Sequence, residues 1–135
     1  MRKLIRAAMT LLTLTFLGGQ LALAAEPQPY TQKSFDQMAA AGTPMIVFVH
    51  ASWCPVCAVQ KPIVDSLANS APYKDVKVLV VDFDTQKKAL RSFDVSRQST
   101  LIAFRGKKEV GRLVGTTQKD LIEVLFQRAA GKSDG

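Results

Sequence analysis

The chain has few residues of the kinds that bind metals or cross-link a fold, because its 135 residues include only two cysteines and one histidine. These three fall one short of the four ligands that close a structural zinc site. The sequence also lacks internal repeats and low-complexity segments, which leaves one ordinary domain with room for a real core. A composition of 47% hydrophobic and 21% charged residues excludes a chain that is disordered throughout.

The first 24 residues have the three-part plan of a secretory signal peptide. A basic start is followed by an apolar stretch over residues 7–17 and then by small residues at Ala22-Leu23-Ala24. We therefore expect cleavage near Ala24 or Ala25 and a location in the periplasm. An uncleaved membrane anchor is the alternative, although the apolar stretch is short for a membrane span.

The sequence also bears on the type of signal, on the charge of the mature chain and on the organisation of the domain. A lipoprotein anchor would require a cysteine directly after the apolar stretch, and none is there. Arg2-Lys3 is not a twin-arginine pair. Removing residues 1–24 leaves 15 basic and 11 acidic residues, a dispersed net charge of +4 that predicts no nucleic-acid partner. The expected organisation is a signal peptide over 1–24, an extended linker over 25–30 and a folded domain over 31–131.

Apolar patterns in the expected domain predict alternating helices and strands. Helices are expected at 34–41, 58–69 and 86–93, and a last one, capped by Thr116 or Thr117, up to Ala129; strands are expected at 45–49, 76–83, 100–104 and 109–114. Val59 and Leu121 are expected on apolar helix faces, and Pro62 should kink the second helix. The order predicts an α/β fold with a central mixed, mostly four-stranded sheet flanked by helices.

Both cysteines lie in the segment Trp53-Cys54-Pro55-Val56-Cys57, between an expected strand and an expected helix. A disulfide across so short a loop stabilises a fold little, so the spacing favours redox chemistry over cross-linking. At the helix N-terminus Cys54 should have a lowered pKa and act as the nucleophile, and Pro55 suits the first helical position. Cys57, one turn further and more buried, should resolve the mixed disulfide, and Trp53 should shield the pair and offer a flat apolar contact.

The segment 51–57 with Pro62 five residues later resembles the active site of the thioredoxin family, and the similarity extends from about Tyr30 to Ala130. The resemblance implies a three-layer thioredoxin fold and thiol–disulfide exchange with protein thiols and disulfides, without a cofactor or a resident metal. It further suggests a monomer that receives electrons from a membrane thiol reductase. Catalysis is expected at Cys54 and Cys57, and substrate binding at Trp53, Pro55, Gln98 and Ser99.

Three positions depart from the family pattern. Ser99 stands where thioredoxins have a cis-proline, and because a non-proline cis bond costs about 2.5–4 kcal/mol we expect a trans Gln98–Ser99 bond. Phe48 and Val80 stand where thioredoxins have a buried acidic residue and its partner lysine. These replacements remove the family's proton relay and alter both its grip on substrate and its exclusion of metals.

Other interpretations of the same residues remain open. His50 either fills a space at the end of a strand or acts on the pair, as a modulator of Cys54 or as a third metal ligand. With the two thiols it would suit copper(I) and hence a periplasmic copper-binding or chaperone protein. A non-catalytic binding domain with an idle disulfide is a third interpretation. Asp82, Asp84 and Asp94 are expected to cap strand ends and turns, and Arg97 to lie beside a substrate backbone or simply in solvent.

Overall fold

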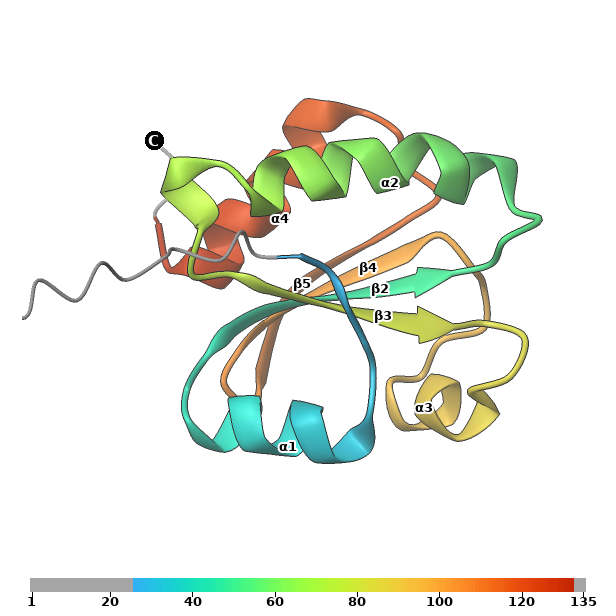
Figure 1. The fold of residues 1–135 in the computed structure, drawn as a ribbon, viewed down its shortest axis with the longest axis horizontal. Helices are drawn as coiled ribbons and strands as arrows, with labels where there is room; N and C mark the ends of the chain where they lie inside the picture. The colour runs from blue at the N-terminus through green and yellow to red at the C-terminus, as the bar shows by residue number, and fades with distance from the viewer. Residues whose placement is uncertain (1–25, 133–135) are drawn as a thin grey trace, which may run out of the picture.

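The structure is a computed structural model that describes residues 26–132. Five strands form one sheet with helices on both faces (Figure 1). The strands are β1 (Gln28–Pro29), β2 (Pro44–His50), β3 (Lys77–Asp82), β4 (Thr100–Arg105) and β5 (Lys108–Val114). The helices are α1 (Gln32–Ala40), α2 (Pro55–Ala68), α3 (Lys87–Ser92) and α4 (Lys119–Ala130), and a short 3₁₀ helix spans Ala71–Tyr73. The predicted α/β class and the three layers are confirmed.

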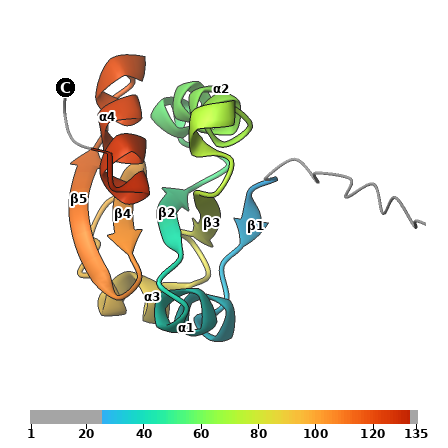
Figure 2. The same cartoon turned by 90° about the vertical axis from the view of Figure 1, so that its left-hand side faces the viewer.

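The sheet has the strand order β1-β3-β2-β4-β5, which puts β2 at its centre. β2 and β3 are parallel, whereas β4 runs antiparallel to both β2 and β5. Helices α2 and α4 cover one face and α1 and α3 the other, as the two views show (Figures 1 and 2). Side chains of β2 alternate between the two cores: Ile46 and Phe48 face α2 and α4, and Val47 and Val49 face α1 and α3.

One strand was not expected from the sequence. Gln28–Pro29, in the segment predicted to be a linker, pairs in parallel with Leu79 and Val80 of β3 and forms the fifth strand, β1. The segment is extended, as predicted, but it belongs to the edge of the sheet. Two residues are too few to show the alternation that identifies a strand in a sequence.

The helices bury slightly different faces from those predicted. In α2 the buried stripe is formed by Cys57, Gln60, Val64, Leu67 and Ala68. Val59, which we expected on this face, is exposed, and Leu121 of α4 is exposed as well. Pro62 lies inside α2, which is continuous from its first residue to its last. No helix within residues 26–132 is both long and apolar enough to cross a membrane.

The predicted cap of the last helix was wrong. The N-cap residue of α4 is Gln118, and its side chain makes no capping hydrogen bond. Thr116 lies two residues earlier, where its carbonyl accepts a hydrogen bond of 2.8 Å from the Gln60 side chain. The segment between β5 and α4 is therefore attached to α2 instead of being the first turn of a helix.

Candidate active site

The cysteine pair lies where the central strand β2 passes into α2. Cys54 is the N-cap residue of α2, and its sulfur accepts a hydrogen bond of 3.1 Å from the backbone N–H of Cys57. Pro55 occupies the first turn, where a missing N–H leaves no hydrogen bond unmade. Because the free N–H groups and the dipole of a helix N-terminus stabilise negative charge, this placement suits a thiolate at Cys54.

Both thiols are free and buried, but they differ in environment. Cys54 is 3% exposed and Cys57 is fully buried, so Cys57 is the more buried of the two, as expected. Burial raises the pKa of Cys57 to about 11, and the adjacent Cys54 thiol adds to this shift. Hydrogen bonds with the backbone of Ala51 and Ser99 act in the opposite direction. Cys57 therefore holds its proton more firmly than a free thiol does.

Trp53 is held beside the pair by contacts with the end of β3. Its indole N–H donates to Asp84 Oδ2 at 2.9 Å, and its ring lies edge-on to Phe83 with 6.5 Å between the ring centroids. The side chain is nevertheless 57% exposed, which is unusual for tryptophan. A fixed and exposed indole next to the nucleophile offers a flat apolar surface to an incoming chain.

Ser99 lies beside Cys57 in an unusual backbone conformation. Its φ is +58°, in the left-handed region, and no cis peptide bond occurs within residues 26–132, so the expected trans Gln98–Ser99 bond is confirmed. A non-glycine residue in this region carries about 1–2 kcal/mol of strain. Two backbone bonds of 2.9 Å hold it: its N–H donates to Val49 O, and its carbonyl accepts from Gly115 N–H.

The residues predicted to bind substrate differ in how far they are exposed to solvent. Pro55 is exposed, Gln98 is partly exposed and Ser99 is buried. The Ser99 hydroxyl donates to the Gln98 carbonyl at 2.5 Å and is therefore already engaged. The structure brings Ser99 to the cysteine pair, but its side chain is not free to bind a substrate.

Gln60 is a site residue that the sequence did not identify. Its side-chain amide donates to two carbonyls, Ser99 O at 3.2 Å and Thr116 O at 2.8 Å, and the residue is fully buried. Placing the apolar Val59 on the buried face of this helix concealed it, because a polar glutamine beside an apolar residue is expected on the exposed side. The available signal was a glutamine three residues after Cys57, at a spacing that puts both residues on one side of a helix.

Phe48 and Val80 pair directly across β2 and β3 on the face that α2 covers. His50 packs edge-on to Phe48 with 5.4 Å between ring centroids, and all three line a cavity of about 60 Å³. His50 thus packs on an aromatic ring at the end of β2, and its action on Cys54 stays a prediction. Phe48 and Val80, which stand at the positions of the family's proton relay, belong to the apolar core on this face of the sheet.

The acidic residues at the end of β3 form a turn. Asp82 Oδ1 accepts hydrogen bonds from the backbone N–H groups of Asp84 and Thr85 and from the Thr85 hydroxyl. The bonds from Thr85 lower the pKa of Asp82. Within residues 26–132, no three His, Cys, Asp or Glu side chains come close enough to hold a metal. The copper interpretation is thus left with the two thiols as ligands.

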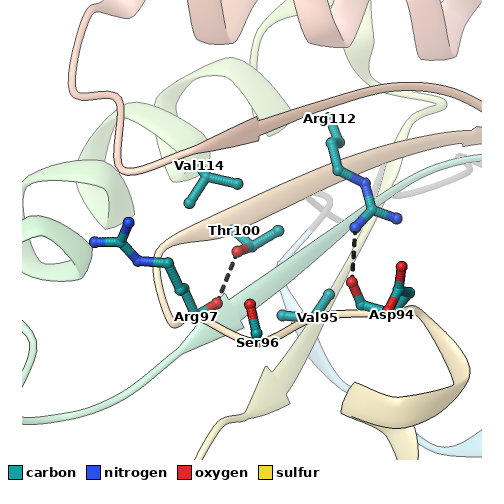
Figure 3. Close-up of a pocket in the computed structure, with 7 residues that line it drawn as sticks. All are labelled: Asp94, Val95, Ser96, Arg97, Thr100, Arg112 and Val114. Atoms are coloured by element: carbon teal, nitrogen blue, oxygen red, sulfur yellow. Dashed lines mark hydrogen bonds between the residues drawn. The ribbon is translucent and has the colours of Figure 1, made fainter.

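A hollow of about 200 Å³ lies between β5 and the segment before β4 (Figure 3). Its polar groups bond to one another: Thr100 Oγ1 donates to Arg97 O at 2.7 Å, and Arg112 donates to Asp94 O at 3.2 Å while pairing with Glu109. The guanidinium of Arg97 points away from Asp94 and Arg112 (Figure 3). These bonds support the loop that carries Gln98 and Ser99.

A nucleophilic sulfur at a helix N-terminus, with a buried thiol one turn behind it, defines a dithiol site for disulfide exchange. Comparisons with known proteins agree with this chemistry. The family model described as Thioredoxin matches residues 26–127. The thioredoxin of Chlamydia trachomatis is 35% identical over 101 residues, which cover 75% of this chain and 96% of that protein.

Solved structures show the same relationship. The crystal structure of Trxlp from Edwardsiella tarda matches with a TM-score of 0.73 and 40% identity, over 75% of this chain and 98% of that one. A thioredoxin mutant from Halobacterium salinarum shares the fold at 23% identity, with a TM-score of 0.69 over 79% of this chain and 93% of its own. The chain belongs to the thioredoxin family, and its activity is that of a thiol–disulfide oxidoreductase.

The raised pKa of Cys57 predicts a pH-dependent stability of the reduced protein. The folded protein holds this proton up to about pH 11 whereas a free thiol releases it near 9.0, so the stabilisation is complete below pH 9 and is lost as the pH rises through 11. The free energy of unfolding of the reduced wild type should therefore decline over this range relative to that of reduced Cys57→Ala. Urea unfolding at stepped pH measures it, and a constant difference between the two proteins would contradict the prediction.

Proposed function

We propose that this protein is an exported oxidoreductase that exchanges disulfides with protein substrates, acting as a reductant or as a dedicated exchanger for one class of partner. The observation that carries the proposal is the hydrogen bond of 3.1 Å from Cys57 N–H to Cys54 Sγ at the start of α2. It marks Cys54 as the sulfur at which negative charge is stabilised and Cys57 as the thiol held directly behind it.

The exchange proceeds in two steps. The Cys54 thiolate attacks one sulfur of a substrate disulfide, forms a mixed disulfide and releases the other substrate sulfur as a thiolate. Cys57 then loses its proton and attacks Cys54 Sγ, which closes the Cys54–Cys57 disulfide and releases the second substrate thiolate. The substrate disulfide gains two electrons and the protein dithiol loses them, and the substrate thiolates take up protons according to their own pKa values.

The surroundings of the pair support a specialised partner. Trp53 and Pro55 are exposed on either side of Cys54 in the sequence, and Gln98 is partly exposed in the loop beside Cys57. We assign these three residues to the contact with substrate. We also propose that the protein works as a monomer and that a membrane thiol reductase returns its electrons.

Replacement of the resolving thiol should trap the substrate. In Cys57→Ala the mixed disulfide at Cys54 has no internal thiol to resolve it, so a covalent complex with a protein disulfide should persist. Non-reducing electrophoresis followed by mass spectrometry detects it. Cys54→Ala is the matched control and should trap nothing, since the remaining thiol is fully buried. Failure of Cys57→Ala to trap any partner, with no exchange by the wild type on a model disulfide, refutes the proposal.

Export rests on the sequence of residues 1–24, which lie outside the described residues. Expression of the full chain in a bacterium with a periplasm should release, on osmotic shock, a mature protein that begins at Ala25 or Glu26. Intact-mass measurement identifies that start, and a chain lacking residues 2–24 serves as the cytoplasmic control. Recovery of the uncleaved chain in the membrane fraction would show an anchor instead.

The direction of electron flow is tested by the reduction potential of the Cys54–Cys57 couple. A reductant should have a potential close to that of thioredoxin, about −270 mV, whereas a strong oxidant should lie near −120 mV. Equilibration with glutathione buffers of known potential, followed by alkylation of free thiols, measures the value. A potential near the oxidant end would reverse the proposed direction.

A further inference from the structure

Gln60 connects the helix that carries both cysteines to two loops beside them. One loop precedes β4 and contains Ser99, and the other follows β5 and contains Thr116. β4 and β5 are antiparallel, with Thr100 opposite Val114, so both loops lie at the same end of the sheet. The Gln60 amide donates to the carbonyl of Ser99 at 3.2 Å and to that of Thr116 at 2.8 Å, so that one side chain ties both loops to α2.

The Ser99 loop needs such support. Ser99 has a left-handed backbone, which a residue with a side chain adopts only when its surroundings hold it there. Its carbonyl accepts from Gly115 N–H at 2.9 Å as well as from Gln60, and the first of these bonds links the two loops to each other. Gln60 supplies the connection between this pair of loops and the cysteine helix.

The position of Ser99 matters to Cys57. Ser99 O lies 3.2 Å from the Gln60 amide, one helical turn from Cys57 on the same buried face of α2, and the Ser99 backbone partly offsets the effect of burial on the pKa of Cys57. Cys57 and Gln60 are three residues apart on the buried stripe of α2. A shift of Ser99 away from α2 would therefore remove one of the groups that favour ionisation of the resolving thiol.

The two ends of the Gln60 amide differ in their hydrogen bonding. Gln60 Oε1 is the one buried side-chain nitrogen or oxygen among residues 26–132 that has no hydrogen-bond partner. An unsatisfied buried acceptor destabilises a fold, and an apolar side chain of similar volume would remove that acceptor but would also take the donor from the Thr116 carbonyl. What the amide provides and a hydrocarbon cannot is its pair of N–H donors to Ser99 and Thr116.

We propose that Gln60 is a positioning residue for the resolving step, which holds the Ser99 backbone against Cys57 by bonding the carbonyls of Ser99 and Thr116. The inference rests on the proposed exchange function. Gln60 contacts neither the substrate nor the sulfur that attacks it. It acts on the second displacement, in which the Cys57 thiolate attacks Cys54 Sγ, the Cys54–Cys57 bond forms, and the mixed disulfide breaks to release the substrate thiolate.

The test separates the two displacements in Gln60→Met, which keeps the length of the side chain and removes both donors. The reduced mature protein is mixed with a peptide disulfide, quenched with acid at short times and analysed by mass spectrometry. We expect attack by Cys54 at the wild-type rate and resolution slowed by about tenfold, the factor that corresponds to a loss of roughly 1.4 kcal/mol. The mixed disulfide should therefore accumulate, and the pH at which resolution reaches half its maximum rate should rise.

Gln86 provides a matched control away from the pair. Its side chain also bridges two segments, since Nε2 donates to Tyr30 O at 3.0 Å and Oε1 accepts from Asp82 N–H at 2.8 Å. Gln86→Met should lower the melting temperature and leave the ratio of the two rates unchanged. Gln60→Leu, of different shape, repeats the test in case Gln60→Met folds poorly, and circular dichroism establishes which variants are folded.

The outcomes are distinct. Selective slowing of resolution in a folded Gln60 variant supports the inference. Equal slowing of both steps, no slowing of either, or the same change in Gln86→Met overturns it. If the wild type itself forms no mixed disulfide with any substrate, the exchange proposal fails. If the wild type exchanges disulfides and the Gln60 variant behaves like it, only the inference about Gln60 fails.

Discussion

The packing of α2 on the central strand β2 is the constraint on which the rest of the site depends. β2 lies between β3 and β4 and is covered on both faces, and only four residues separate its end from the start of α2. The face of α2 that begins at Cys57 is buried against the sheet. At the N-terminus of this helix the Cys54 sulfur accepts a hydrogen bond from the backbone N–H of Cys57. One packing arrangement thus places the nucleophile, buries the resolving thiol and raises the pKa of that thiol.

The departures from the family pattern form one connected set. Phe48 and Val80 extend the apolar core beneath α2, so the sheet offers no ionisable group to the pair at those positions. Ser99 takes a left-handed backbone with a trans peptide bond before it. The buried polar group near Cys57 is an amide on α2 itself, which bonds to the loops of the sheet instead of lying under the helix. The buried polar side chain near Cys57 is therefore carried by α2 and not by β2 or β3.

The sequence predicted the architecture well because both cores are recorded in local patterns. Apolar runs marked β2, β3 and β4, and helical spacing marked α2 and α4, within a few residues of their observed ends. β1 was missed because two residues carry no periodicity. Val59 and Leu121 were placed on buried faces because an apolar residue beside a helical stripe looks the same in sequence as one within it.

The sequence by itself determined the fold class, the cysteine pair at a helix start, the apolar replacements at Phe48 and Val80, and the absence of a proline at position 99. Tertiary structure alone decided that Gln60 is buried beside Cys57 and that Trp53 is tied to Asp84. The reason is sequence separation: these bonds join residues 31 to 56 positions apart. Helical and strand periodicities report only on neighbours within a few residues, so contacts between loops and helices appear only when the sheet brings them together.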